Sequence, residues 1–198
     1  GYLPIRHENG GNLEEEIVIR WLKRTFENHK GTMVFHNALY DVGWLKREGV
    51  ELTCPLRDTM FAAPLFDENR WSYSLNNLGM DFLAESKDET LLETAAKAWG
   101  VNPKGGMWAL PAKYVGPYAE QDAVLTLKLW KIFKARIEIE GLQKIYDLEC
   151  DLIPLLIEMR WRGVRIDTDR AEQTSEQLSK KEQQLSLIHI SEPTRQSP

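Results

Sequence analysis

Residues 32–41 read Thr32-Met33-Val34-Phe35-His36-Asn37-Ala38-Leu39-Tyr40-Asp41, an apolar run followed directly by polar residues. The compact apolar run at the start of this stretch is typical of a buried strand. Asn37 then begins a helix that we expect to continue to about Arg47, where Gly49 stops it. Asn37 and Asp41 are therefore predicted to lie one helical turn apart, directly after a strand.

Strands and helices alternate on both sides of this stretch. Residues 2–7 are expected to form a short strand upstream, and an extended segment leads to Arg57 and Asp58 downstream. Pro117 is predicted in the first turn of a long helix, and Pro154 at a kink in a later one. Helices are predicted over residues 13–26, 61–65, 75–83, 91–99, 118–139 and 142–162, and the polar segment at residues 170–185 is also helix-prone. This order indicates an α/β fold, a sheet with helical cover.

Composition indicates a globular, acidic chain of 198 residues with a formal net charge of −5. The sequence contains no apolar run of about 18 residues, so we expect no membrane-spanning segment and no membrane partner. Proteins that coat duplex DNA are usually basic, so the acidic balance favours catalysis at a strand end over general DNA coating. Cys54 and Cys150 lack metal-ligand spacing and are expected to be free, buried thiols.

A second motif reads Tyr118-Ala119-Glu120-Gln121-Asp122 and again places a carboxylate four residues after a polar partner. Carboxylates from separate elements can hold hard divalent cations, and such cations can cleave phosphodiesters. Each motif alone is a weak signal, because an aspartate on a helix is often only a solvated charge. Asn37 fits two roles, a cap for its own helix and a contact to substrate.

Other polar and aromatic residues suggest ordinary structural roles. Asp58 is expected to cap a helix or close a turn. Trp21, Trp44 and Trp130 lie at helical spacing with other apolar residues and are expected in the core. Trp108 precedes the second motif in a loop and is the best candidate for stacking on a nucleic-acid base.

Together these motifs resemble the 3′–5′ exonuclease domain of family A DNA polymerases, within the DEDD exonuclease superfamily. Residues 35–41 resemble its second motif, and residues 118–122 its third motif in the tyrosine-bearing variant. The similarity extends in family order to residues 2–8, 58–60, 74–78 and 158–167, the last of which resembles the join to the polymerase domain. The resemblance covers residues 1–185 and implies an RNase H-like fold.

The resemblance also implies a division of the chain. Residues 1–140 correspond to the exonuclease domain, and residues 141–185 to the first helices of the polymerase domain. The family's first motif, an Asp-x-Glu on the first strand, does not precede Asp41. We therefore expect an N-terminally truncated domain that lacks its first strands. Residues 186–198 resemble a translated sequencing adapter and are expected to be an unstructured tail.

The resemblance implies two-metal hydrolysis of the 3′-terminal phosphodiester of DNA, as in proofreading, with release of 5′ mononucleotides. Asp41 and Asp122 would bind Mg²⁺ or Mn²⁺, Tyr118 would orient the attacking water, and Asn37 would contact the substrate strand. The implied partners are a single-stranded or frayed 3′ end of DNA and the polymerase domain of the same parent chain. The implied location is the cytoplasm of a bacterial cell or of a phage-infected host. With only half of the four-carboxylate site, the fragment itself is expected to be inactive or nearly so.

Two other functions remain open from the sequence. One is a stand-alone DEDD ribonuclease similar to ribonuclease D, against which the polymerase-like join at residues 158–167 argues. The other is a catalytically inert exonuclease-like scaffold within a polymerase. An intact Asp-x-Glu in the parent chain would exclude the scaffold.

Overall fold

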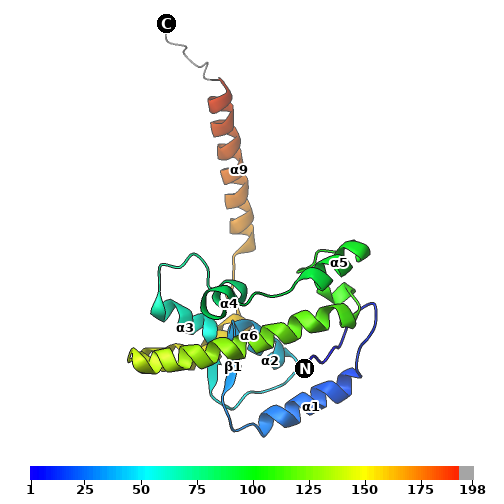
Figure 1. Cartoon of the computed structure of the whole chain (residues 1–198). Coiled ribbons are helices and arrows are strands. Elements are labelled where there is room, and N and C mark those ends of the chain that lie inside the picture. Colours follow the sequence, from blue (N-terminus) through cyan, green and yellow to red (C-terminus); the bar gives the residue numbers. More distant parts are fainter. Residues whose placement is uncertain (192–198) are drawn as a thin grey trace. The chain divides into compact units, whose positions relative to one another are not determined.

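The computed structural model describes residues 1–191, with side chains described as far as residue 185. The chain forms two compact units, and the boundary between them in the sequence lies between Trp161 and Arg162. The first unit is mainly helical with one small sheet (Figure 1). Its elements are α1 (Glu15–Glu27), β1 (Met33–Phe35), α2 (Ala38–Arg47), β2 (Leu56–Asp58), α3 (Thr59–Phe66), α4 (Leu75–Leu83), α5 (Thr90–Trp99), a 3₁₀ turn at Met107–Ala109, α6 (Ala112–Ile139), α7 (Gln143–Asp151) and α8 (Ile153–Arg162).

The sheet consists of β1 and β2, which run parallel with Met33 opposite Leu56 and Phe35 opposite Asp58. Parallel neighbours need a crossover, and α2 supplies it. The prediction of mixed strands and helices is confirmed in this form. The prediction of a strand at residues 2–7 is wrong. Hydrogen bonds to side chains and to loop backbone hold this segment in place of strand pairing. The backbone amide of His7 donates to the Asn12 side chain, and His7 Nδ1 lies 2.7 Å from the Leu110 carbonyl oxygen.

The long helix α6 begins at Ala112, earlier than the sequence predicts. Pro117 lies inside it, not in its first turn. A proline this close to the N-terminus removes a single hydrogen bond, to the carbonyl of Lys113, so the helix can continue through it. α6 packs against β1 and against α3, α4 and α5. Its buried stripe recurs at helical spacing and contains Leu125, Leu129, Phe133 and Ile137.

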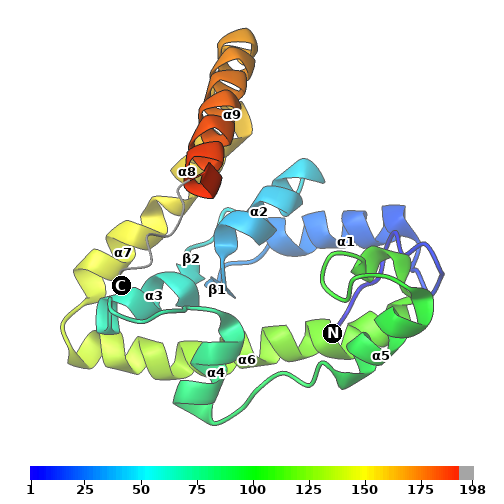
Figure 2. The ribbon, with the colours of Figure 1, turned by 90° about the horizontal axis from the view of Figure 1, so that it is seen from above.

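The predicted helix at residues 142–162 is divided in two near Pro154. α7 ends at Asp151, and Pro154 lies in the first turn of α8, where proline is tolerated. Figure 2 shows α7 turning back from the end of α6, and it packs on β2 and α3. Tyr146 and Ile153 are fully buried in the same core as Phe133. The first compact unit therefore continues beyond residue 140, and the assignment of residues 141–185 to a polymerase domain stays a prediction.

The predictions for cysteine and tryptophan have mixed outcomes. Cys54 and Cys150 are free and buried, as expected. Trp130 packs against the main core, with its ring centroid 5.7 Å from that of Tyr146. Trp21 and Trp44 were expected in the core but are 53% and 47% exposed, so this prediction is wrong. Helical spacing identifies a shared face without showing that another element covers it.

The second unit contains α9 (Thr168–Ser191). Residues 163–167 form neither a helix nor a strand. α9 continues past residue 185 to Ser191, so the first part of the predicted tail is helical. Residues 192–198 of that tail lie outside the described residues. Within the described chain, no helix is both long and apolar enough to cross a membrane.

Candidate functional site

The N-terminus of α2 is anchored by the carboxylate of Asp58, which is fully buried at the end of β2. Its two oxygens accept hydrogen bonds from the backbone amides of Asn37 at 3.1 Å and Ala38 at 2.6 Å. The amide of Met60 donates to the same carboxylate at 2.7 Å, which caps α3. The predicted capping role of Asp58 is thus confirmed, and one side chain fixes the start of two helices.

Asn37 occupies the N-cap position of α2, with a left-handed backbone at φ 76°. Its side chain makes no capping hydrogen bond within the described chain, because Asp58 already satisfies the amides at this helix end. Asparagine tolerates the left-handed conformation better than most residues. The side chain is therefore left facing a cavity, where Asn37 is among the lining residues.

That cavity, of about 870 Å³, is called the site cavity below. It brings together Asn37 and Asp41 of α2 with Asp122 of α6, which were singled out separately in the sequence. Tyr118 does not line it but lies one helical turn before Asp122. Among the other lining residues are His36, Tyr40, Ser74, Lys87 and Thr126. Residues from two distant parts of the chain thus face one space.

The surroundings of Asp41 disfavour the charged form of its carboxyl group. Solvent reaches Asp41, yet the surrounding protein displaces much of the bulk water, and this burial raises the pKa of its carboxyl to about 6. The negative charges of Asp58 and Asp122 raise that pKa further. A cation near Asp41 would relieve both effects, since it favours the charged form of the carboxyl.

Asp122 and Tyr118 are joined through Lys87, a residue that the sequence reading did not consider. The Lys87 ammonium donates to the Tyr118 hydroxyl at 2.8 Å and lies 2.9 Å from Asp122 Oδ1. It also lies 4.5 Å from the centroid of the Tyr118 ring. Burial lowers the pKa of Lys87, but the hydrogen bond to Tyr118 and the charge of Asp122 outweigh it, so the pKa is raised overall. Lys87 therefore stays charged.

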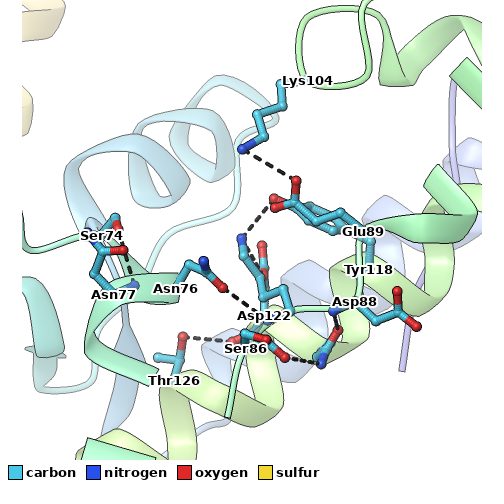
Figure 3. Close-up of polar contacts among 12 residues, drawn as sticks. Ser74, Asn76, Asn77, Ser86, Asp88, Glu89, Lys104, Tyr118, Asp122 and Thr126 are labelled. Atoms are coloured by element: carbon cyan, nitrogen blue, oxygen red, sulfur yellow. Dashed lines mark hydrogen bonds and ion pairs between the residues drawn. The ribbon is translucent and has the colours of Figure 1, made fainter. Parts of the chain in front are cut away.

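The backbone around Lys87 is held by α4 and α6. Asn76 of α4 accepts a hydrogen bond from the Lys87 amide at 3.0 Å. Gln121 of α6 accepts from the amide of Asp88 at 2.9 Å and donates to the carbonyl of Ser86 at 3.1 Å. Figure 3 shows Asn76, Ser86 and Asp88 around the labelled Tyr118 and Asp122. These contacts fix the segment on both sides of Lys87, so its side chain is directed to one place.

The donor set fits a hydrated divalent cation but not a closed protein cage. Within the described residues, no group of three or more metal-ligating side chains forms. Divalent cations such as Mg²⁺ commonly bind through one or two carboxylates together with waters and substrate phosphates, and Asp41 and Asp122 are the carboxylates that line this cavity. Asp122 Oδ1 is buried, and among the described residues its ion-pair partner is the Lys87 ammonium at 2.9 Å, without a further hydrogen bond. This oxygen has capacity for a cation, which the Lys87 ammonium partly satisfies.

Lys87 could not have been found from periodicity. It lies in the polar segment between α4 and α5, where hydropathy carries no signal. Its neighbours Gln121 and Asn76 are also unremarkable in sequence, since amide side chains are common on helix surfaces. Only the fold brings them together.

Comparison with known proteins places these observations in a family. A family profile described as 3′–5′ exonuclease matches residues 2–138. A protein named DNA-directed DNA polymerase from Pseudomonas phage M6 is 42% identical, over 86% of this chain and 26% of that protein. DNA polymerase DpoZ of Vibrio phage phiVC8 is 32% identical, over 87% of this chain and 29% of its own length. DNA polymerase I of Treponema pallidum is 32% identical, over 83% of this chain and 16% of its own length.

The chain thus spans less than a third of the length of these relatives. The profile match ends at residue 138, close to the end of α6 at Ile139. It includes both sequence motifs and the whole site cavity. The chain therefore belongs to the 3′–5′ exonuclease domain family of family A DNA polymerases.

Proposed function

We propose that this chain is the proofreading part of a DNA polymerase, and that its parent removes nucleotides from the 3′ end of DNA as 5′ mononucleotides. The observation that carries the proposal is the convergence of Asp41 and Asp122 on one cavity from two separate helices. The relatives are named as DNA polymerases, which favours this function over a stand-alone ribonuclease. We also propose that the β1–α2–β2 unit and α6 belong to an RNase H-like fold.

In this proposal Asp41 and Asp122 bind Mg²⁺ or Mn²⁺. Such ions activate water and stabilise the charge of the leaving 3′ oxygen. Tyr118 orients the attacking water, because its hydroxyl accepts from Lys87 and keeps its own proton for donation. Asn37 contacts the substrate strand, since its side chain is not used as a helix cap.

The substrate in this proposal is a single-stranded or frayed 3′ end. The lining of the site cavity includes Phe35, Tyr40 and Leu75, whose apolar surfaces suit an unpaired base. The polymerase domain of the same parent chain is the proposed partner that delivers this end. Two of the four implied carboxylates are present, so we expect hydrolysis by this chain alone to be slow or undetectable.

Metal binding tests the proposal independently of turnover. Mn²⁺ is titrated into the chain, and free Mn²⁺ is followed by electron paramagnetic resonance. We expect weak binding that Asp41→Asn and Asp122→Asn each reduce at least about fivefold, because each loses a charged ligand. Asp151→Asn, at an exposed position in α7, is the control and should bind as the unaltered chain does. Equal binding by all four proteins would contradict the metal site and favour an inert scaffold.

Hydrolysis is measured in parallel as the stepwise shortening of a 5′-labelled single-stranded oligonucleotide from its 3′ end, since each step releases one mononucleotide. Any mononucleotide release should be abolished by EDTA and by Asp122→Asn. Release that persists in either condition would not come from this site. Rapid release that depends on Mg²⁺ and on Asp41 would show that two carboxylates are enough, against our expectation for this chain.

A further inference from the structure

A second cavity of about 430 Å³ lies between α2 and α8 and is called the aromatic pocket below. Tyr40, Trp44 and Arg47 of α2 line it, together with Ile157, Arg160 and Trp161 of α8. Ile157 is buried and forms part of an apolar lining. The pocket is a separate cavity that shares Tyr40 with the site cavity, and the function proposed above gives it no part in the chemical step.

Three aromatic side chains in this pocket are presented to solvent. Tyr40, Trp44 and Trp161 are 56%, 47% and 56% exposed. The rings of Tyr40 and Trp44 meet edge to face with centroids 6.2 Å apart, which fixes their orientation. Exposed aromatic faces of this kind are the platforms on which unpaired bases stack.

Positive charge accompanies these rings. The Arg47 guanidinium lies 5.2 Å from the centroid of the Trp44 ring. The Lys46 ammonium lies 5.7 Å from the centroid of the Trp161 ring and pairs with Glu158. Among the described lining residues the charged side chains are Arg47 and Arg160, with no carboxylate, although the chain carries a net charge of −5. The pocket therefore suits a polyanion that also has planar groups.

Tyr40 connects the aromatic pocket to the proposed catalytic site. It lines both cavities, and its neighbour in sequence is Asp41. On α2, Tyr40, Trp44 and Arg47 follow one another at helical spacing and so share a stripe next to Asn37 and Asp41. A strand whose 3′ end reaches Asp41 can continue past Tyr40 into the pocket.

A protein partner suits a different face of α8. Leu155 and Met159 are exposed and share a helical stripe separate from that of Ile157, Arg160 and Trp161. That stripe is aliphatic and uncharged, which is typical of a protein contact. The aromatic pocket, unlike that aliphatic stripe, is lined by aromatic rings and guanidinium groups, which match bases and phosphates.

We propose that the aromatic pocket is a second subsite for single-stranded DNA, which holds nucleotides upstream of the 3′ end. Bases stack on Trp44 and Trp161, and Arg47 and Arg160 contact the phosphates. The inference rests on the proposed function for the polarity of the strand, but binding in the pocket needs no hydrolysis.

The test is equilibrium binding of fluorescent oligothymidylates in EDTA, measured by anisotropy with the full chain. The doubly substituted Trp44→Ala/Trp161→Ala chain should bind an eight-nucleotide strand at least about thirtyfold more weakly, because two base stacks are lost and each is worth at least about fivefold in affinity. Binding of a dinucleotide, which fits within the site cavity, should not change. Trp71→Ala, at a fully exposed position elsewhere, is the control and should bind both strands normally.

Two further variants separate stacking from misfolding and from charge. Trp44→Phe keeps an aromatic ring and should retain most of the affinity. Arg47→Ala should weaken eight-nucleotide binding and reduce the slope of log affinity against log salt by about 0.7. Circular dichroism confirms that each variant is folded.

The outcomes are distinguishable from those of the metal experiment. If the chain does not bind the eight-nucleotide strand, or the double variant binds it normally, the subsite is wrong whatever Mn²⁺ does. If the pocket variants lose affinity while Asp41 and Asp122 prove irrelevant to Mn²⁺, the subsite stands and the proposed function fails. If the double variant loses self-association but keeps its affinity for DNA, the pocket binds a protein and the inference is overturned.

Discussion

Lys87 provides positive charge at the place where the proposed site would need a cation. Its ammonium lies 2.9 Å from Asp122 Oδ1, and only 10% of its side chain is exposed. A metal ion that binds Asp122 must therefore compete with Lys87 or displace it toward Tyr118. Lys87 acts as an internal counter-ion that stabilises the carboxylate in the absence of metal.

The Lys87→Met variant tests this competition. Removing the ammonium leaves Asp122 without its nearest positive charge, so we expect Mn²⁺ to bind about tenfold more tightly, or about 1.4 kcal/mol at a partly screened site. Lys104→Met is the matched control, because Lys104 pairs at 3.5 Å with Glu89 and not with Asp122. The measurement is the same Mn²⁺ titration. Unchanged or weaker binding in Lys87→Met would mean that the lysine assists the metal instead of competing with it.

Asp41 predicts how the stability of the metal-free chain depends on pH. Its folded pKa of about 6 lies above the ordinary value of 3.8, mainly through burial. The folded chain therefore binds more protons than the unfolded chain between these values, and the free energy of unfolding should fall as pH rises from about 4 to about 6. Above pH 6 the Asp41 contribution is constant.

Urea denaturation in EDTA, repeated across pH 4.5 to 7.5, measures this contribution. Asp41→Asn cannot ionise, so its stability should change less over this interval than that of the unaltered chain. Parallel curves for the two proteins would show that Asp41 ionises normally in the fold. Added Mg²⁺ should selectively stabilise the unaltered chain above pH 6, where Asp41 is charged.

At the scale of elements, the position of Lys87 depends on a close approach between α4 and the segment that follows it. The Glu85 amide donates to the Gly79 carbonyl at 3.2 Å and closes the end of α4. A Cβ at Gly79 would lie 2.8 Å from the Glu85 carbonyl oxygen, which is backbone and cannot rotate away. Glycine is required there because two backbones meet.

Gly79→Ala should displace the segment that carries Lys87. We expect it to lower the free energy of unfolding by about 1–3 kcal/mol, since the clash outweighs the gain in helix propensity. Gly43→Ala in α2 is the matched control, because a Cβ there meets nothing within 4 Å. That substitution should stabilise the chain by about 0.5–1 kcal/mol. Urea denaturation compares the two, and equal stabilities would contradict the close approach.

Elements with complete local signals could be predicted from the sequence. The helix at residues 75–83 agrees with α4, because Ser74 accepts from the Asn77 amide as a typical cap and its apolar spacing is regular. The start of α6 could not be predicted, because Pro117 looks like a helix start when only local rules are applied. Trp44 was assigned to the core for a similar reason, since spacing alone does not show what covers a face.

At the scale of the whole molecule, the site was predicted in part. Asp41 and Asp122 could be selected because each stands one turn after a polar residue in a recognisable motif. Their convergence on one cavity required the fold. Lys87 and the hydrogen bonds that Gln121 and Asn76 make to the backbone around it join segments far apart in sequence, so no local pattern contains them.

The contact between α7 and β2 has a consequence for how this region can be inherited or recombined. Tyr146 donates to the Asp58 carbonyl at 3.1 Å and accepts from the Asp58 amide at 2.9 Å, and the Asp58 carboxylate holds the helix that carries Asp41. Tyr146 lies beyond residue 138, where the family match ends. A gene-shuffling junction placed at that limit would therefore separate Asp41 from its outer support. Chimaeras between related polymerases should be joined after α8, so that the tyrosine and the aspartate come from the same parent.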